Sequence, residues 1–171
     1  MKPDPAEKEL RERMRPGILA KDGFLGTDSR TIADIIEADV AEIEAAGLDT
    51  ARIAELLEDL LLAAEEALET PRRLCGGAVT VRFIEGMGRI PCPFACGFRG
   101  RKGVVELTSP TLNLQFTALH AHLIRGHGFF QGRGAAFRLE PADAVALYRI
   151  CRKPQQPDAP GTPSRDGATS P

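Results

Sequence analysis

Residues 90–97 read Ile-Pro-Cys-Pro-Phe-Ala-Cys-Gly, and residues 120–127 read His-Ala-His-Leu-Ile-Arg-Gly-His. The first segment holds the only close pair of cysteines in the chain, and the second holds all three histidines. A Cys-x3-Cys loop bordered by proline and glycine can direct two sulfur atoms at one point, and a His-x4-His pair at the end of a helix can add two nitrogen atoms. Two sulfur and two nitrogen ligands form the tetrahedral set that Zn²⁺ prefers, and four protein ligands leave no open position. The two segments therefore predict a structural zinc site.

Helix geometry selects the histidines that bind. His120 and His127 lie two helical turns apart, about 10.5 Å along the axis, which is too far for both to reach one ion. His122 and His127 are five residues apart, so the helix must loosen or end before His127, and the flanking glycines would allow this. We therefore predict the metal ligands to be Cys92, Cys96, His122 and His127.

Other uses of these residues stay open at the level of sequence. If residues 112–123 formed a strand, His120 and His122 would share a face and could join His127 in a three-histidine site with an open position, as in catalytic zinc enzymes. Cys75 is a further candidate to replace a ligand. Cys151 falls on the apolar stripe of an expected C-terminal helix and is predicted to be buried.

The region from residue 88 to residue 128 resembles the Cys2His2 zinc-finger class, in which a hairpin with two cysteines packs on a helix with two histidines. It departs from that class because 25 residues separate Cys96 from His122, where the class has about 12. The insertion contains two apolar segments, 104–107 and 112–116, with Ser109-Pro110 between them, so we predict an extra hairpin. Residues 88–93 and 127–132 also resemble small uncharacterised bacterial proteins, which implies no particular activity.

A net charge of −2 conceals a division of the chain into an acidic half and a basic half. Residues 28–70 hold two basic and thirteen acidic side chains, whereas residues 71–153 hold thirteen basic and four acidic ones. Seven of the eight phenylalanines also lie between Phe83 and Phe137. Because the apolar residues change where the charge changes, we expect two separate cores.

The acidic half is predicted to be a helical hairpin. Apolar residues recur at helical spacing over residues 28–46, with Asp28 or Ser29 as the N-cap, and again over residues 50–69. A DNA-reading helix is disfavoured, because the second helix carries six acidic residues against Arg52 alone, and phosphate neutralisation supplies much of DNA affinity. The apolar stripe of the hairpin must then be covered by the basic half or by another copy of the chain.

Together these patterns predict an α+β protein in which an acidic helical hairpin precedes a small zinc-stabilised module of short antiparallel strands and helices, the last helix running near Pro141 to Lys153. The last eighteen residues include five prolines and are expected to be disordered. The expected segments are an N-terminal arm (1–27), the acidic hairpin (28–74), a basic zinc-binding domain (75–153) and the tail (154–171).

The function predicted from sequence is non-catalytic recognition. We expect Arg99, Arg101, Lys102 and Arg133 to contact the partner, because they follow metal ligands and stand beside glycines that let a backbone approach phosphate. The partner is expected to be a protein, including a second copy bound through the acidic helices, and the alternative is DNA or RNA. A histidine-site metalloenzyme is the least favoured alternative. Phe129 and Phe130 are expected to pack beneath the helix.

Two kinds of apolar segment, a membrane span and a secretory signal, are not expected in this chain. Its longest apolar runs are five residues, far below the roughly 20 needed to span a bilayer. The first seventeen residues contain no apolar stretch of the kind a secretory signal needs, so a cytoplasmic location is expected. Two disulfides among the four cysteines are not expected in that compartment.

Overall fold

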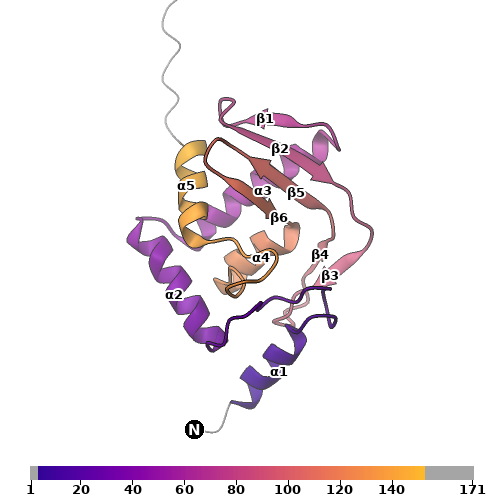
Figure 1. The fold of residues 1–171 in the computed structure, drawn as a ribbon, viewed down its shortest axis with the longest axis vertical. Helices are drawn as coiled ribbons and strands as arrows, with labels where there is room; N and C mark the ends of the chain where they lie inside the picture. The colour runs from indigo at the N-terminus through magenta and orange to yellow at the C-terminus, as the bar shows by residue number, and fades with distance from the viewer. Residues whose placement is uncertain (1–3, 153–171) are drawn as a thin grey trace, which may run out of the picture.

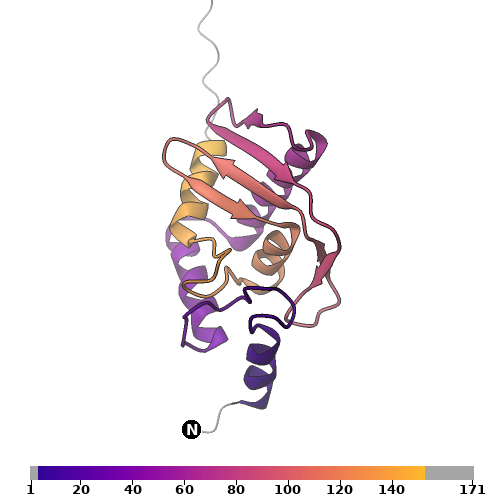
Figure 2. The ribbon, with the colours of Figure 1, turned by 45° about the vertical axis from the view of Figure 1, so that its right-hand side comes forward.

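The computed structural model describes residues 4–152 and has the α+β fold expected from the sequence (Figures 1 and 2). The predicted disordered tail, residues 154–171, lies outside the described residues. The helices are α1 (Pro5–Arg13), α2 (Ile32–Ala45), α3 (Thr50–Glu66), α4 (Ala118–His127) and α5 (Pro141–Cys151). The strands are β1 (Arg72–Leu74), β2 (Val79–Ile84), β3 (Arg89–Pro91), β4 (Arg99–Arg101), β5 (Val104–Thr108) and β6 (Asn113–Phe116).

Helices α2 and α3 are the two helices predicted for the acidic half. Helix α3 starts after Asp49, whose carboxylate accepts a hydrogen bond from the amide of Arg52 at 2.8 Å. The expected N-cap of α2 was wrong, because Thr31 takes this role by accepting from the amide of Asp34. Asp28 instead accepts hydrogen bonds from the side chain of Arg30 and the amide of Arg133.

The larger sheet is antiparallel, in the order β1-β2-β5-β6. The extra hairpin predicted in the insertion is the β5–β6 pair, in which Leu107 lies opposite Leu114. Side chains alternate across the sheet, as expected when one face packs on a core and the other faces water. Helix α3 covers the inner face of the sheet (Figure 1), where residues such as Val81 and Val105 are buried. On the outer face, Arg82 pairs with Glu106.

Two apolar clusters are present, as expected, but each is made of other residues than expected. The larger cluster joins α3 and the buried face of the sheet to parts of α4 and α5, and includes Leu57, Val81, Ile124 and Leu147. The smaller cluster joins the N-terminal arm to the starts of α2 and α4 and to the cysteine loop. Its buried members are Met14, Phe24, Ile32, Ile35, Cys92, Leu119, Leu123 and Phe129. Each cluster thus takes residues from both the acidic and the basic half.

Ion pairs also join the two halves. Arg138 forms a bidentate pair with Asp39 of α2 at 2.8 Å, and both side chains are only 5% exposed. The more exposed Arg125 and Arg152 pair with Glu58 and Asp59 of α3. The apolar stripe of the acidic hairpin is therefore covered by the basic half, and part of the opposite charge is neutralised within the chain.

Cys75 and Cys151 form a disulfide between the β1–β2 turn and the end of α5. Their Cα atoms lie 4.6 Å apart although 76 residues separate them along the chain. Cys151 was expected to be buried and is partly buried beside the larger cluster. Its partner was not predicted from sequence, because pairing at such a separation follows from topology. Disulfides persist mainly in oxidising compartments. This bond therefore does not support the expected cytoplasmic location, which stays a prediction.

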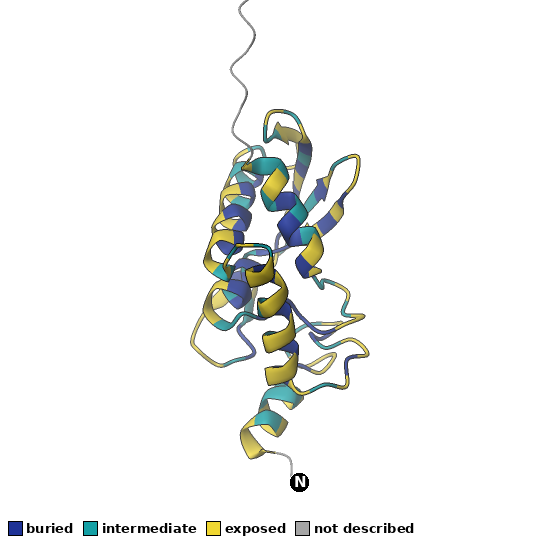
Figure 3. Cartoon of the chain, turned by 90° about the vertical axis from the view of Figure 1, so that its left-hand side faces the viewer, coloured by how far each residue is buried: buried dark blue, intermediate teal, exposed yellow. Residues whose placement is uncertain are grey.

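Burial follows the amphipathic patterns of the helices. Figure 3 shows exposed residues along the outward sides of the helices and buried residues facing the interior. Within residues 4–152, no helix is both long enough and apolar enough to cross a bilayer.

Candidate metal centre

The cysteine loop lies between two short strands. Strands β3 and β4 pair antiparallel, with Pro91 opposite Arg99, and so bring the two ends of residues 92–98 together. The amide of Cys92 donates to the carbonyl of Phe98 at 2.8 Å, and the amide of Ala95 donates to the carbonyl of Cys92. Ala95 and Gly97 both have positive φ, which bends the chain tightly. This compact loop brings the two sulfur atoms within 4.8 Å of each other.

Helix α4 supplies the two histidines. It runs from Ala118 to His127 and ends with Gly128 in the left-handed conformation, at φ 62°. The helix was expected to loosen or end before His127, and it does not end there, because His127 is its last residue. The rings of His122 and His127 nevertheless face the same site, with centroids 5.3 Å apart.

The structure brings the four predicted ligands together. Their ligand atoms all lie within 4.8 Å of one another. Sγ of Cys92 lies 3.5 Å from Nε2 of His127, and Sγ of Cys96 lies 3.2 Å from Nε2 of His122. Zinc bond lengths of about 2.3 Å to sulfur and 2.0–2.1 Å to nitrogen give a sulfur–nitrogen separation of about 3.5 Å in a tetrahedral site. The donor set and spacing therefore suit a tetrahedral metal ion.

Two phenylalanines of the cysteine loop hold the imidazole rings. Phe94 stacks on His127 with ring centroids 4.1 Å apart, and Phe98 stacks on His122 at 3.9 Å. Phe94 also meets the buried Phe129 edge to face, which ties the site to the smaller cluster. Neither role was predicted from sequence, although phenylalanine alternates with cysteine over residues 92–98.

Burial shifts the pKa values of the ligands in the protein without metal. It lowers the pKa of His122 and of His127, and the neighbouring His122 adds to the effect on His127, so both rings favour the neutral form that binds metal. Burial raises the pKa of the Cys92 thiol to about 11, with a further contribution from Cys96. A metal ion must therefore displace a proton from Cys92.

His120 and Cys75 do not take part in the site. His120 is buried, with its Nδ1 accepting a hydrogen bond from the amide of Thr117 and its Nε2 lying 2.8 Å from the carbonyl oxygen of Phe137. Cys75 is bound in the disulfide. Because His120 lies on a helix and turns away from the ligands, the three-histidine alternative is excluded.

The structure separates the four basic residues predicted to contact a partner. Arg99 and Arg101 share the exposed face of the β3–β4 ribbon with Arg89, which lies directly opposite Arg101. Lys102 is exposed and follows the ribbon. Arg133 lies elsewhere, in a loop whose backbone binds Thr27 and Asp28.

Phe129 and Phe130 are buried, at 1% and 0% exposure, as expected for packing beneath the helix. Neither ring can therefore stack on a base in this conformation.

Comparisons with protein-family models, with curated proteins and with solved structures each found no match to this chain.

Proposed function

We propose that this chain is a non-catalytic recognition protein in which a structural Zn²⁺, bound by Cys92, Cys96, His122 and His127, holds a basic ribbon that binds nucleic acid. Four protein ligands fill a tetrahedral site, so the ion has no open position at which to activate water or substrate. Sulfur and imidazole ligands in this ratio favour zinc over the hard cations, which take oxygen ligands. When bound, the ion would join the ribbon to α4.

The ribbon face defined by Arg89, Arg99 and Arg101 carries the proposal. Among the described residues, none of the three forms a salt bridge, whereas Arg125, Arg138 and Arg152 are paired with the acidic helices. Like charges directly opposite each other on a strand pair are destabilising. Such an arrangement favours a partner that carries closely spaced negative charges, as the phosphate backbone does.

A hollow beside this face leaves room for such a charge. Its volume is about 340 Å³, and Arg89 and Arg101 line it together with Gly86, Gly88 and Glu85. The two arginines reach it from opposite strands of the ribbon. Glu85 would oppose an anion there, so the three arginines, rather than the hollow alone, must supply the attraction.

Binding of the full-length, zinc-loaded chain to labelled single-stranded DNA, single-stranded RNA and duplex DNA tests the proposal by fluorescence anisotropy over a range of salt. The full chain is needed because the two halves share both cores. A variant with Arg89, Arg99 and Arg101 changed to Gln should bind more weakly, and its plot of log affinity against log salt should be shallower by about one unit for each lost phosphate contact.

The matched control changes three exposed arginines outside the ribbon, Arg52, Arg73 and Arg149, to Gln, which alters the net charge equally. This control should keep the slope of the unchanged protein. Equal losses in both variants, equal affinity for poly-glutamate, or failure of the unchanged protein to bind any of the three nucleic acids at low salt would each contradict nucleic-acid binding by this face.

A further inference from the structure

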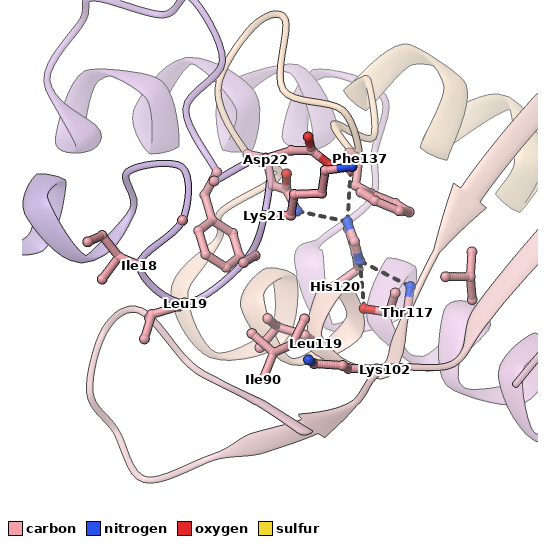
Figure 4. Close-up of a pocket in the computed structure, with 16 residues that line it drawn as sticks. Ile18, Leu19, Lys21, Asp22, Ile90, Lys102, Thr117, Leu119, His120 and Phe137 are labelled. Carbon is pink, nitrogen blue, oxygen red and sulfur yellow. Dashed lines mark hydrogen bonds between the residues drawn. The ribbon is translucent and has the colours of Figure 1, made fainter. Parts of the chain in front are cut away.

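A second cavity lies apart from the four metal ligands, between the loop of residues 17–24 and the start of α4. Its volume is about 410 Å³, within the range of about 300–1,000 Å³ typical of small-molecule pockets. Figure 4 shows Lys21 and Asp22 on one side of it and Ile90 and Lys102 on the opposite side. The nucleic-acid proposal makes no use of this cavity.

Its walls are mostly apolar. Phe24 and Leu119 are buried members of the smaller cluster and line the cavity, and Ile90 packs beside them. Ile18 also lines the cavity and is 54% exposed. An apolar group inside the cavity would find contacts on several sides.

Gln131 lines the cavity, and one polar atom of its side chain has no hydrogen-bond partner. It is 3% exposed, and its Oε1 has no partner among the described residues. Its Nε2 lies 2.9 Å from Nε2 of His120, which must carry a hydrogen, because the carbonyl of Phe137 can only accept from it. Turning the amide would place Oε1 against that hydrogen and move the –NH₂ group to the position that Oε1 now holds. In the orientation present, the buried Oε1 of Gln131 is unsatisfied.

The charged groups of the lining lie on both sides of the cavity, with Lys21 and Asp22 across from Lys102 (Figure 4). Lys21, Asp22 and Lys102 are all exposed and line it. Two positive charges and one negative charge leave a net charge of +1. This balance matches a ligand with a single negative charge better than one with the double charge of a phosphate monoester.

We propose that this cavity binds a small amphipathic carboxylic acid. The carboxylate contacts Lys102 at the entrance, the apolar body lies against Phe24 and Leu119, and a polar group at the far end pairs with the unsatisfied amide of Gln131. Cavities with apolar walls and a few fixed polar groups are typical of sites for such ligands.

Amide NMR shifts of the full-length, zinc-loaded protein test the site, with phenylpropanoate, its para-hydroxy analogue and the uncharged phenylpropanamide as probes. Phenylpropanoate should shift signals from residues lining the cavity, and the amide should bind about tenfold more weakly, because it lacks the charge that pairs with a lysine. The para-hydroxy acid should bind about tenfold more tightly than phenylpropanoate. Gln131→Met should still bind phenylpropanoate but should lose the preference for the hydroxyl group.

Lys102→Gln should abolish the preference for the acid over the amide. The matched control is Lys8→Gln, which removes the same charge from an exposed residue outside this cavity and should change nothing. No shifts at millimolar probe, equal binding of acid and amide, equal effects of the two lysine variants, or a hydroxyl preference that survives in Gln131→Met would each overturn the proposed ligand site.

Discussion

Two phenylalanine rings orient the imidazoles of the candidate metal site. Phe94 and Phe98 stack nearly parallel on His127 and His122, with interplanar angles of 6° and 8°. Groups that orient metal-bound imidazoles affect metal affinity although they do not touch the ion. Stacking on one face limits rotation of each ring, so Nε2 stays directed at the two sulfur atoms.

Replacing Phe98 or Phe94 with Leu should weaken metal binding while leaving all four ligands in place. An aromatic pair contributes about 0.5–1.5 kcal/mol beyond its buried area, so each change should raise the dissociation constant for zinc by up to about tenfold. Competition with a chromophoric chelator measures it. Phe137→Leu is the control, because that ring lies against His120, which is not a ligand. Equal loss in the control would show that the effect is general loosening of the fold.

The titration of the ligands predicts proton release. Because burial raises the pKa of Cys92 to about 11, its thiol is protonated at pH 8 before metal binds, whereas the lowered pKa values of both histidines leave their rings neutral. Zinc binding at pH 8 should therefore release at least one proton, and zinc affinity should keep rising as pH increases toward 11. Calorimetry in buffers of different ionisation enthalpy counts the protons. A pH-independent affinity between pH 8 and 10 would contradict this assignment.

The convergence of Cys92, Cys96, His122 and His127 was predictable from sequence, whereas the contacts around them were not. Cysteine and histidine at these spacings allow few arrangements, and helix geometry was enough to choose His122 over His120 as the predicted ligand. The partners of His120 come from Thr117 and from Phe137, seventeen residues away, and the Cys75 disulfide spans 76 residues. Contacts between distant segments depend on the topology of the whole chain, which residue spacing does not specify.

At the scale of elements, the end of α4 decides how the metal site meets the acidic hairpin. Gly128 ends the helix at φ 62°, and a Cβ atom built there would lie 2.9 Å from Cγ2 of Val40 and 3.3 Å from Cγ2 of Ile36. Helix α2 thus packs closely against the turn that follows His127. Glycine is required at this turn for two reasons, its backbone conformation and the space that α2 leaves.

Gly128→Ala should destabilise the protein more than the same change at another left-handed helix end. Gly47, after α2, has φ 76° and nothing within 4 Å of an added Cβ, so Gly47→Ala should cost only the conformational term of about 1 kcal/mol. Gly128→Ala adds overpacking against α2, which typically costs a further 1–3 kcal/mol. Urea unfolding of both variants with zinc present measures the difference. Equal losses in the two variants would show that α2 moves away without cost.

Elements with a strong apolar period were predictable, and those without one were not. The hairpin β5–β6 and helices α2, α3 and α5 follow clear patterns. Helix α1 was missed, because none of its residues is fully buried and its start depends on capping by Asp4 and on Pro5. Strand β1 was also missed, because three residues starting with two exposed arginines show no alternation, and its pairing with β2 comes from the turn at Cys75.

Across the whole molecule, the cysteine loop packs on one apolar cluster and the larger sheet belongs to the other. Cys92 is a buried member of the smaller cluster, which also holds the N-terminal arm, whereas the larger cluster contains none of the four ligands. The Cys75–Cys151 disulfide joins two residues that pack beside the larger cluster. We therefore expect loss of the ion to act mainly on one end of the molecule.

Removing zinc should therefore loosen one end of the fold and leave the other in place. Hydrogen exchange measured by mass spectrometry should rise in α1, residues 14–25 and the β3–β4 ribbon after chelation, because these segments depend on the smaller cluster. Exchange in α3, β2 and β5 should stay slow, because their buried residues belong to the larger cluster. Changing Cys92 and Cys96 to Ser should reproduce the chelator pattern without chelator. Rapid exchange throughout the sheet after either treatment would mean that the ion stabilises both clusters as one unit, and unchanged exchange in the ribbon would mean that the ion has no structural role there.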